Sequence, residues 1–190
     1  MTIGLYFGSF NPIHTGHLII AQTALNEARL DYVWLIVSPH NPLKPKKNLL
    51  SEYDRFRMAE LALEGNDRIL ASNVEFSLSK PSFTIDTLTH LRDTYRSYEF
   101  ALIMGQDNLQ QLPRWKNYEA ILKYYPIHVY PRPGTAPSEL DTHPNVHFFQ
   151  APLLDISATH IRDQIRAGKS VRYLVPEATW AYLDREGLYR

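Results

Sequence analysis

The sequence predicts an α/β fold with a doubly wound, mostly parallel sheet and helices on both of its faces. Short apolar runs of strand length alternate, through most of the chain, with segments whose apolar residues recur at helical spacing. The first runs are continuously apolar, as in parallel strands that are buried on both faces. The chain has 190 residues, of which 44% are hydrophobic and none is Cys, so one core can form without disulfides. We therefore expect a single domain over residues 1–190.

The first unit of this fold is a strand, a loop and a helix. The apolar run 3–7 stops at Gly8, and we expect it to form the central strand of the sheet. A helix is expected to start near Thr15, which is a suitable N-cap residue. Its apolar positions follow helical spacing at Leu18, Ala21, Leu25 and Ala28.

The later elements continue the alternation of strands and helices. Further strands are expected over 32–37, 69–74, 100–104 and 127–130, and helices over 51–64, 84–95 and 157–167. Gly168 is a natural stop for the last helix. In such folds, ligands bind beyond the carboxyl ends of the strands, where the strand order reverses. The proline-rich loop that leads to Lys44 lies at this edge, and the segment 131–144 is either a mobile flap or a long connection.

Charge and composition exclude several classes of protein. Lys and Arg number 20, and Asp and Glu also number 20, so no net charge favours a long nucleic acid or an anionic membrane as partner. The lack of Cys excludes disulfide scaffolds, Cys-based zinc sites and cysteine nucleophiles. Residues 1–7 have no basic flank, no long apolar run and no small-residue cleavage site, so we expect a cytoplasmic location.

The loop GSFNPIHTGH, residues 8–17, connects the first strand to the first helix. Gly8 lets the backbone approach a ligand closely, and the start of the helix presents unpaired N–H groups and a positive dipole end to an anion. His14 and His17 are three residues apart, so both rings can donate to one polyphosphate, and Gly16 leaves room between them. We therefore expect a phosphate site at this loop.

Two other interpretations of the imidazoles are open. A histidine in a loop is often only solvated or hydrogen-bonded to its surroundings, and two histidines at this spacing can also bind zinc. Zinc would need a third ligand, and neither Cys nor a carboxylate occurs in the loop. Metal binding by His14 and His17 is therefore the weaker interpretation.

A second segment, ISATHIR at 156–162, opens the last predicted helix. Ser157 is a natural N-cap, and Thr159 and Arg162 share a face near the positive end of the helix. Such capped helices are common and usually structural. Together with the first loop, however, this helix gives two N-termini and a guanidinium that can converge on one triphosphate.

These two segments resemble the signature pair of the HxGH nucleotidyltransferase superfamily, which has a Rossmann-like nucleotidyltransferase fold. Five further segments are similar, in order and approximate spacing, to those of bacterial-type nicotinate mononucleotide adenylyltransferases: PSFT at 81–84, MGQDN at 104–108, PRW at 113–115, RPG at 132–134 and GLYR at 187–190. The resemblance covers nearly the whole chain. It implies adenylyl transfer from ATP to nicotinate mononucleotide, which gives deamido-NAD and pyrophosphate, with magnesium carried on ATP.

The resemblance also implies roles for individual residues. Those expected to hold or neutralise phosphates during catalysis are His14, His17, Lys44 and Arg162. The others expected around ATP are Gly8, Ser9, Phe10, Gly16, Gly105, Asp107, Ser157 and Thr159, so the helical part from about 157 to 190 completes this site. The acceptor would be bound by Thr84, Trp115 and Arg132. No residue is assigned to the metal, because phosphate oxygens and water would hold Mg²⁺.

Several of these residues also have a structural interpretation. Trp115 is compatible with an ordinary half-buried core position, and Arg132 with a solvated place in its loop. Thr84 and Asp107 are both suitable helix caps. Ala158 stands where many members of the family have Ser, so no hydroxyl contact is expected there.

Three other functions fit parts of the pattern. A preference for nicotinamide mononucleotide, or for both acceptors, would leave the motifs unchanged. A phosphopantetheine adenylyltransferase typically has Thr in place of the first histidine, so His14 argues against it. A nucleotide sensor without catalysis should have lost His14, His17 or Arg162, and all three are present. The pattern leaves open whether the chain forms a homo-oligomer.

Overall fold

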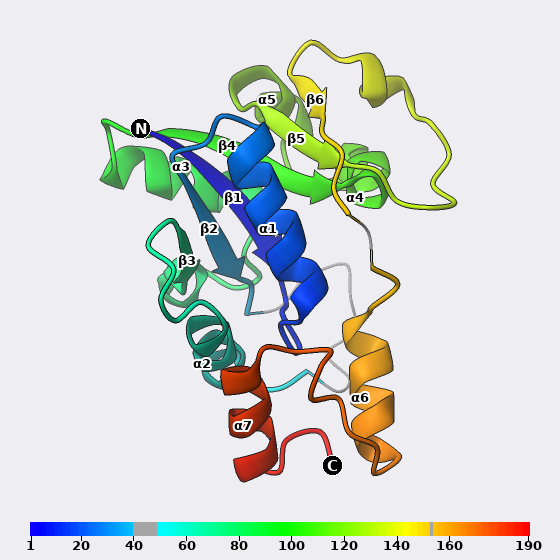
Figure 1. Ribbon diagram of the computed structural model, residues 1–190. Coiled ribbons are helices and arrows are strands. Elements are labelled where there is room, and N and C mark those ends of the chain that lie inside the picture. Colours follow the sequence, from blue (N-terminus) through cyan, green and yellow to red (C-terminus); the bar gives the residue numbers. More distant parts are fainter. Residues whose placement is uncertain (40–48, 153) are drawn as a thin grey trace.

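The computed structural model describes residues 1–39, 49–152 and 154–190, and these contain a parallel sheet of six strands (Figure 1). The strands are β1 Thr2–Gly8, β2 Tyr32–Val37, β3 Ile69–Ser72, β4 Glu99–Gly105, β5 Ile127–Tyr130 and β6 Val146–Phe148. Their order across the sheet is β3-β2-β1-β4-β5-β6, and every neighbouring pair is parallel. This order confirms the predicted doubly wound fold with a central first strand.

The helices cover both faces of the sheet and extend beyond one of its edges. They are α1 Thr15–Glu27, α2 Glu52–Ala62, α3 Thr84–Thr94, α4 Gln106–Gln111, α5 Tyr118–Tyr124, α6 Ala158–Arg166 and α7 Glu177–Arg185, with short 3₁₀ turns η1 Val74–Ser77, η2 Leu112–Arg114 and η3 Glu139–Thr142. Figure 1 shows α6 and α7 together beyond the carboxyl ends of β1 and β2, with the C-terminus between them. No helix within the described residues has the length and apolar character needed to cross a bilayer.

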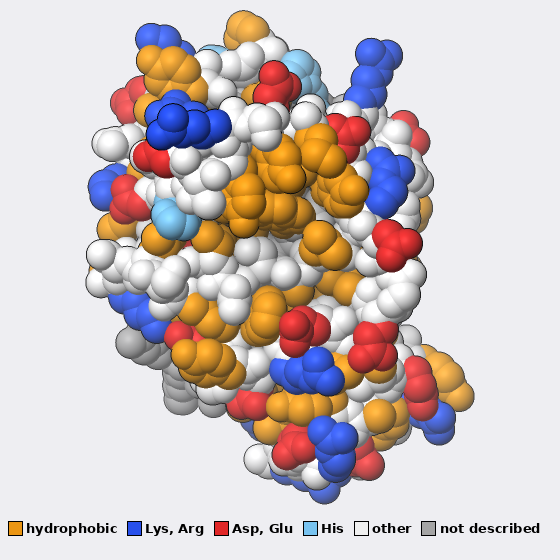
Figure 2. Space-filling view, turned by 90° about the vertical axis from the view of Figure 1, so that its left-hand side faces the viewer, with side chains coloured by type: hydrophobic (Ala, Val, Ile, Leu, Met, Phe, Trp, Pro, Cys, Tyr) orange, Lys and Arg blue, Asp and Glu red, His pale blue; other side chains and the backbone are white. Residues whose placement is uncertain are grey.

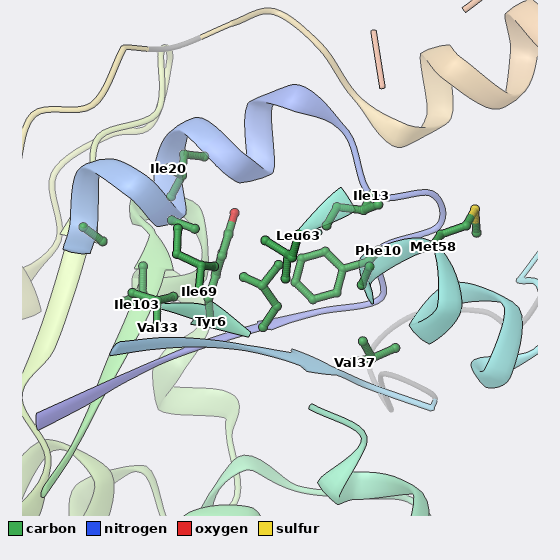
Figure 3. Packing of buried hydrophobic residues seen from close by; sticks show 14 of the residues in the cluster. Tyr6, Phe10, Ile13, Ile20, Val33, Val37, Met58, Leu63, Ile69 and Ile103 are labelled. Carbon is green, nitrogen blue, oxygen red and sulfur yellow. The ribbon is translucent and has the colours of Figure 1, made fainter. Parts of the chain in front are cut away.

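Each face of the sheet has its own hydrophobic core, because side chains alternate between the two faces along a strand. Ile3 and Leu5 of β1 belong to the core that includes the buried leucines of α3, whereas Tyr6 belongs to the core that includes the buried face of α1. Figure 3 shows Phe10 and Ile13, from the loop after β1, packed into this second core. Strand β1 is therefore buried on both sides, as its continuous apolar run predicts.

Charged side chains of both signs are mixed over the surface. On the face seen in Figure 2, hydrophobic side chains gather in the upper half, while Lys, Arg, Asp and Glu alternate in the lower part. Neither sign dominates this face. The arrangement agrees with the equal totals of basic and acidic residues in the sequence.

The strand order reverses between β1 and β4. From β1 the chain first adds β2 and β3 on one side, and then places β4, β5 and β6 on the other. Gly8 ends β1 and Gly105 ends β4, so these two predicted site residues lie at the same edge of neighbouring strands. In doubly wound sheets this edge is where ligands bind.

Some predicted boundaries were wrong, and some elements were not predicted. The strand expected over 69–74 ends at Ser72, because η1 begins at Val74. The N-cap of α1 is His14 and not Thr15, whose backbone N–H and hydroxyl both donate to the carbonyl oxygen of Leu174 at 3.1 Å. The sequence pattern also missed α5 and β6, and it gave no bounds for α7 within the expected helical part 157–190.

Candidate active site at the carboxyl ends of β1 and β4

The turn after β1 is shaped by Gly8 and Phe10. The backbone of Phe10 is in the left-handed region, with φ of 43°, and its side chain is only 2% exposed. A Cβ atom on Gly8 would lie 2.8 Å from the Phe10 ring, so only glycine fits there. The Phe10 ring packs edge-on against Tyr6 and His17. The ring therefore supports the site from the core. Because it is buried, only the backbone of Phe10 is available for the predicted ATP contact.

His14 and His17 form a stacked pair at the start of α1. Their ring centroids are 3.6 Å apart, with an angle of 25° between the planes. The backbone N–H of His14 donates to Nδ1 of His17 at 3.2 Å, which assigns the proton of the neutral His17 ring to Nε2. A Cβ atom on Gly16 would lie 3.1 Å from Nδ1 of His14, so glycine leaves the ring the room that the sequence predicts.

Both imidazoles are held in the neutral form. Burial lowers the pKa of His14 to about 4, and the nearby Arg132 guanidinium contributes in the same direction. Burial also holds the pKa of His17 well below its usual value, with further contributions from His14 and then Arg132. At neutral pH the pair therefore offers N–H donors without positive charge.

Helix α6 brings Arg162 to the same loop. Ser157 is the N-cap of α6, as predicted, and its hydroxyl accepts a bond from the N–H of His160 at 3.1 Å. Arg162 donates from Nη1 to the carbonyl oxygen of Asn11 at 2.7 Å, and from Nη2 to the Thr159 hydroxyl at 3.2 Å. The predicted pairing of Thr159 with Arg162 on one face of the helix is confirmed.

Two buried side-chain nitrogens at this junction have no hydrogen-bond partner among the described residues. They are Nδ1 of His14 and Nε of Arg162. Buried polar groups in folded proteins are nearly always hydrogen-bonded. Both nitrogens belong to residues that the sequence predicts to bind phosphate. Unpaired nitrogens are expected on such residues, because a bound phosphate would be their hydrogen-bond partner.

Asn11 connects the loop to two distant parts of the chain. Its Oδ1 atom accepts hydrogen bonds from the Tyr189 hydroxyl at 2.6 Å and from the N–H of Leu50 at 3.3 Å. Asn11 and Tyr189 are both buried. The C-terminal segment thus contacts the loop directly, in the region where the sequence predicts that it completes the ATP site.

On the β4 side, Gly105 lies beneath an ion pair between Asp107 and Arg132. The Arg132 Nε and Asp107 Oδ1 atoms are 3.5 Å apart, and a Cβ atom on Gly105 would meet both side chains. Arg132 also donates to the Tyr130 hydroxyl at 3.2 Å, and this hydroxyl lies 3.2 Å from that of Tyr6. Asp107 is not a helix cap, because the N-cap of α4 is Gly105.

A pocket of about 570 Å³ opens between the end of β1 and the start of α3. Its lining includes Gly8 and Ser9 together with Asp107, Thr84 and Trp115. Thr84 is the first residue of α3 and not its cap, which is Phe83, and the first turn of a helix leaves N–H groups without intrahelical partners. Trp115 is half-buried and packs against the core on this side of the sheet.

One predicted acceptor residue lies outside the pocket. Arg132, predicted to bind the acceptor, is not part of the pocket lining and instead interacts with Asp107 and the histidine pair. Lys44 lies outside the described residues. The segment 131–144 is a connection that contains η3, and Gln106 of α4 donates to Asp141 of this segment at 3.2 Å.

Sequence reasoning missed several polar residues of the pocket wall. Glu75, Ser82 and Ser38 line the pocket, and Arg55 lies behind it with 0% exposure. One signal was available for Arg55. It lies three residues before Met58 on the buried face of α2, and a charge at such a position needs specific partners.

Comparison with known proteins identifies the family. Residues 5–164 match the model of the cytidylyltransferase-like family. The chain is 54% identical to a protein from Cytophaga hutchinsonii over 92% of this chain and 91% of that protein, and 48% identical to one from Flavobacterium johnsoniae over the full length of both. Both relatives carry the name probable nicotinate-nucleotide adenylyltransferase.

Solved structures agree with this fold at lower identity. The nicotinic acid mononucleotide adenylyltransferase of Plasmodium falciparum has been solved in complexes with APC and with NaAD. The present chain matches these structures with TM-scores of 0.82 and 0.81 at 19% and 20% identity, over 99% of its length and 96% and 97% of theirs. The fold, the extent of the sequence matches and the family model agree, and the chain belongs to the nicotinate-nucleotide adenylyltransferase family of cytidylyltransferase-like proteins.

Proposed function

We propose that this protein transfers the adenylyl group of ATP to nicotinate mononucleotide, in NAD biosynthesis, with the triphosphate held between the loop after β1 and the start of α6. An oxygen of the acceptor phosphate attacks the α-phosphorus, the bond to the β-phosphate breaks, and pyrophosphate leaves with its electron pair. No protein nucleophile is needed for this displacement. The protein contributes position and charge stabilisation.

The observation that carries the triphosphate assignment is the pair of unpartnered nitrogens on His14 and Arg162. They come from different elements: His14 is the N-cap of α1, and Arg162 belongs to α6 but bonds to the carbonyl oxygen of Asn11 in the same loop. The N-termini of both helices favour anions. A phosphate oxygen between them would accept the bonds that the protein leaves open. Lys44 is proposed, from the resemblance alone, to neutralise further charge.

His17 is proposed to act as a neutral donor to the leaving pyrophosphate. Its Nδ1 atom accepts from the backbone, so Nε2–H is the group left for a phosphate. The low pKa keeps this proton arrangement unchanged throughout the neutral range. A donor fixed before the reaction stabilises charge that develops in the transition state without having to reorganise.

The 570 Å³ pocket is proposed to receive the pyridine end of nicotinate mononucleotide. Trp115 would stack on the ring, and the N–H groups of the first turn of α3, beginning at Thr84, would favour a carboxylate over a neutral amide. The pocket and the triphosphate region meet at Gly8 and Ser9, which line the pocket and precede the histidine loop.

Magnesium is proposed to arrive with ATP. Within the described residues, no group of three or more His, Asp or Glu side chains is placed to hold a metal ion. A hard ion that loses water reluctantly fits phosphate oxygens and water as its main ligands, and it would supply charge neutralisation on the triphosphate. The cytoplasmic location remains a prediction from the sequence.

The test is to incubate the purified protein with ATP and Mg²⁺ and, in separate reactions, with nicotinate mononucleotide, nicotinamide mononucleotide or phosphopantetheine. Pyrophosphate release is then measured. We expect release with nicotinate mononucleotide and much less with the other two. Equal efficiency with nicotinamide mononucleotide would show dual specificity. Release with none of the three would contradict the proposal and favour a non-catalytic nucleotide sensor.

A further inference from the structure

Arg55 and Glu75 are buried side chains of charged residue types at the pocket, with 0% and 1% exposure; Glu75 lines the pocket and Arg55 lies behind it. Among the described residues, the acceptors of the Arg55 guanidinium are all backbone carbonyl oxygens. Its Nη1 bonds to Ser9 at 2.6 Å and Ser38 at 2.8 Å, its Nη2 to Pro39 at 2.9 Å and its Nε to Leu50 at 3.0 Å. One guanidinium therefore fastens together the segments that follow β1 and β2 and the segment that precedes α2.

Glu75 makes the corresponding connection on the other side of the pocket. It accepts hydrogen bonds from the hydroxyls of Thr87 at 2.7 Å and Ser82 at 3.1 Å, and also from Ser38. Ser82 and Thr87 flank the first turn of α3. Glu75 thus fixes the turn whose N–H groups face the proposed acceptor.

The two charged residues meet on Ser38, through different atoms. The carbonyl oxygen of Ser38 accepts from Arg55, and its hydroxyl donates to Glu75. The N–H of Ser38 donates to the carbonyl oxygen of Gly8 at 2.9 Å. Ser9, Ser38, Glu75 and Ser82 all line the pocket, so this chain of bonds forms one continuous wall.

We propose that Arg55 and Glu75 are positioning residues which, by bonding to Ser38, set the spacing between the Gly8–Ser9 turn and the first turn of α3, and so determine acceptor binding. This inference rests on the proposed function of the pocket. A role in stability alone explains the geometry less well, because replacing a buried ionic group with apolar residues often costs no stability. The planar fork of arginine, in contrast, can bond to several carbonyls in fixed directions.

The main test compares Arg55→Lys with a matched control, Arg68→Lys. Arg68 also donates to backbone carbonyls, those of Asp31 at 3.0 Å and Leu30 at 2.9 Å, but at the opposite edge of the sheet. Lysine keeps the charge and loses the fork. We expect Arg55→Lys to raise the KM and the calorimetric Kd for nicotinate mononucleotide by about tenfold or more, with KM for ATP within about twofold of wild type. Arg68→Lys should leave all three constants within about twofold.

Ser38→Ala is the second variant, because it removes one hydroxyl and leaves the carbonyl bond to Arg55 intact. The change is small, so this variant should fold even if Arg55→Lys does not. It should raise the same two acceptor constants and not KM for ATP. The inference would be overturned if Arg55→Lys had the wild-type KM and Kd for nicotinate mononucleotide. If Arg55→Lys does not fold, wild-type values of these constants in Ser38→Ala would overturn it. So would a parallel rise of the ATP and acceptor constants, which indicates general distortion.

The wild type is assayed first, so that the two proposals fail in different ways. No pyrophosphate release with nicotinate mononucleotide would contradict the proposed function. An active wild type whose Arg55→Lys variant binds the acceptor normally would contradict the positioning role alone.

Discussion

The hydroxyl of Tyr189 donates a hydrogen bond of 2.6 Å to Oδ1 of Asn11, and this bond ties the C-terminal segment to the loop that carries the histidine pair. The carbonyl oxygen of Asn11 accepts from Arg162 at 2.7 Å. The position of the loop relative to α6 therefore depends on both a side chain of the C-terminal segment and a guanidinium of α6.

Removal of the hydroxyl in Tyr189→Phe tests this dependence. We expect KM for ATP to rise by about 3- to 10-fold and the free energy of unfolding to fall by about 1 kcal/mol, the usual net value of a buried hydrogen bond. Steady-state kinetics and urea unfolding measure the two effects. Tyr173→Phe is the control, because Tyr173 is 88% exposed. If Tyr189→Phe is as active and as stable as the control, the bond does not position the loop.

His17→Ala should affect turnover much more than ATP binding. The donor is most valuable when charge moves onto the leaving pyrophosphate, and removal of one such donor typically lowers kcat by about 10²–10³-fold. Single-turnover rates and the Kd for ATP separate the two effects, with the exposed His90→Ala as control. A kcat within a few-fold of wild type would show that His17 is not a transition-state donor.

Arg162→Lys should be impaired although it keeps the positive charge. Arginine reaches Asn11 and Thr159 and still has Nε–H for a phosphate, whereas lysine supplies a single nitrogen. We expect kcat/KM for ATP to fall by about tenfold or more. Arg166→Lys on the same helix, at an exposed ion pair with Asp163, should be close to wild type. Normal kinetics in Arg162→Lys would mean that α6 does not bind the triphosphate.

Trp115→Ala should raise KM for nicotinate mononucleotide and leave KM for ATP nearly unchanged. Stacking of an aromatic side chain on a base contributes about 1–3 kcal/mol, or about 5- to 150-fold in affinity. Trp115→Phe keeps a stacking face and should recover most of the loss. A rise of both Michaelis constants in the Ala variant would instead identify Trp115 as a packing residue.

Stability should fall as the pH is lowered from 7 to 5. The pKa of His14 is about 4 in the folded protein against 6.5 for the free side chain, so below pH 6.5 the unfolded chain binds a proton that the folded protein does not. By linkage, this one residue should reduce the free energy of unfolding by about 2 kcal/mol between pH 7 and 5. His128, with a pKa lowered to about 4, acts in the same direction.

Urea unfolding of His14→Gln at the two pH values checks this prediction. The variant should lose about 2 kcal/mol of the pH dependence, whatever its stability at pH 7. His90→Gln, on the exposed side of α3, is the control. An unchanged pH dependence in His14→Gln would show that this imidazole is not held neutral by the fold.

The sequence predicted the features that depend on residues close together in the chain. The apolar run before Gly8 identified the central strand, and the Ser157 cap and the shared helix face of Thr159 and Arg162 were predicted correctly. The short elements were missed for a physical reason. β6 has three residues and α5 has seven, which is too few for a hydrophobic period to be recognised.

The pocket wall was missed because its contacts join residues far apart in the chain. Arg55 bonds to Ser9, which is 46 positions away, and Glu75 to Thr87 across the start of a helix. In the sequence, Glu75 does not differ from an ordinary surface charge, and only its spacing from Met58 on α2 distinguishes Arg55. Arg132 was assigned to the acceptor from its motif, yet its side chain interacts with the neighbouring Tyr130 and with Asp107, which only the folded sheet brings near.

The hydrogen bonds at Asn11 span 151 positions to Arg162 and 178 to Tyr189, so they join the loop after β1 to the last part of the chain. Contacts of such long range carry a loop-closure cost that nearby contacts do not. A chain that has formed its sheet but has not docked α6 and the C-terminal segment has no complete triphosphate site. Under the proposed function, ATP binds selectively to the fully docked state and stabilises it by RT ln(1 + [ATP]/Kd).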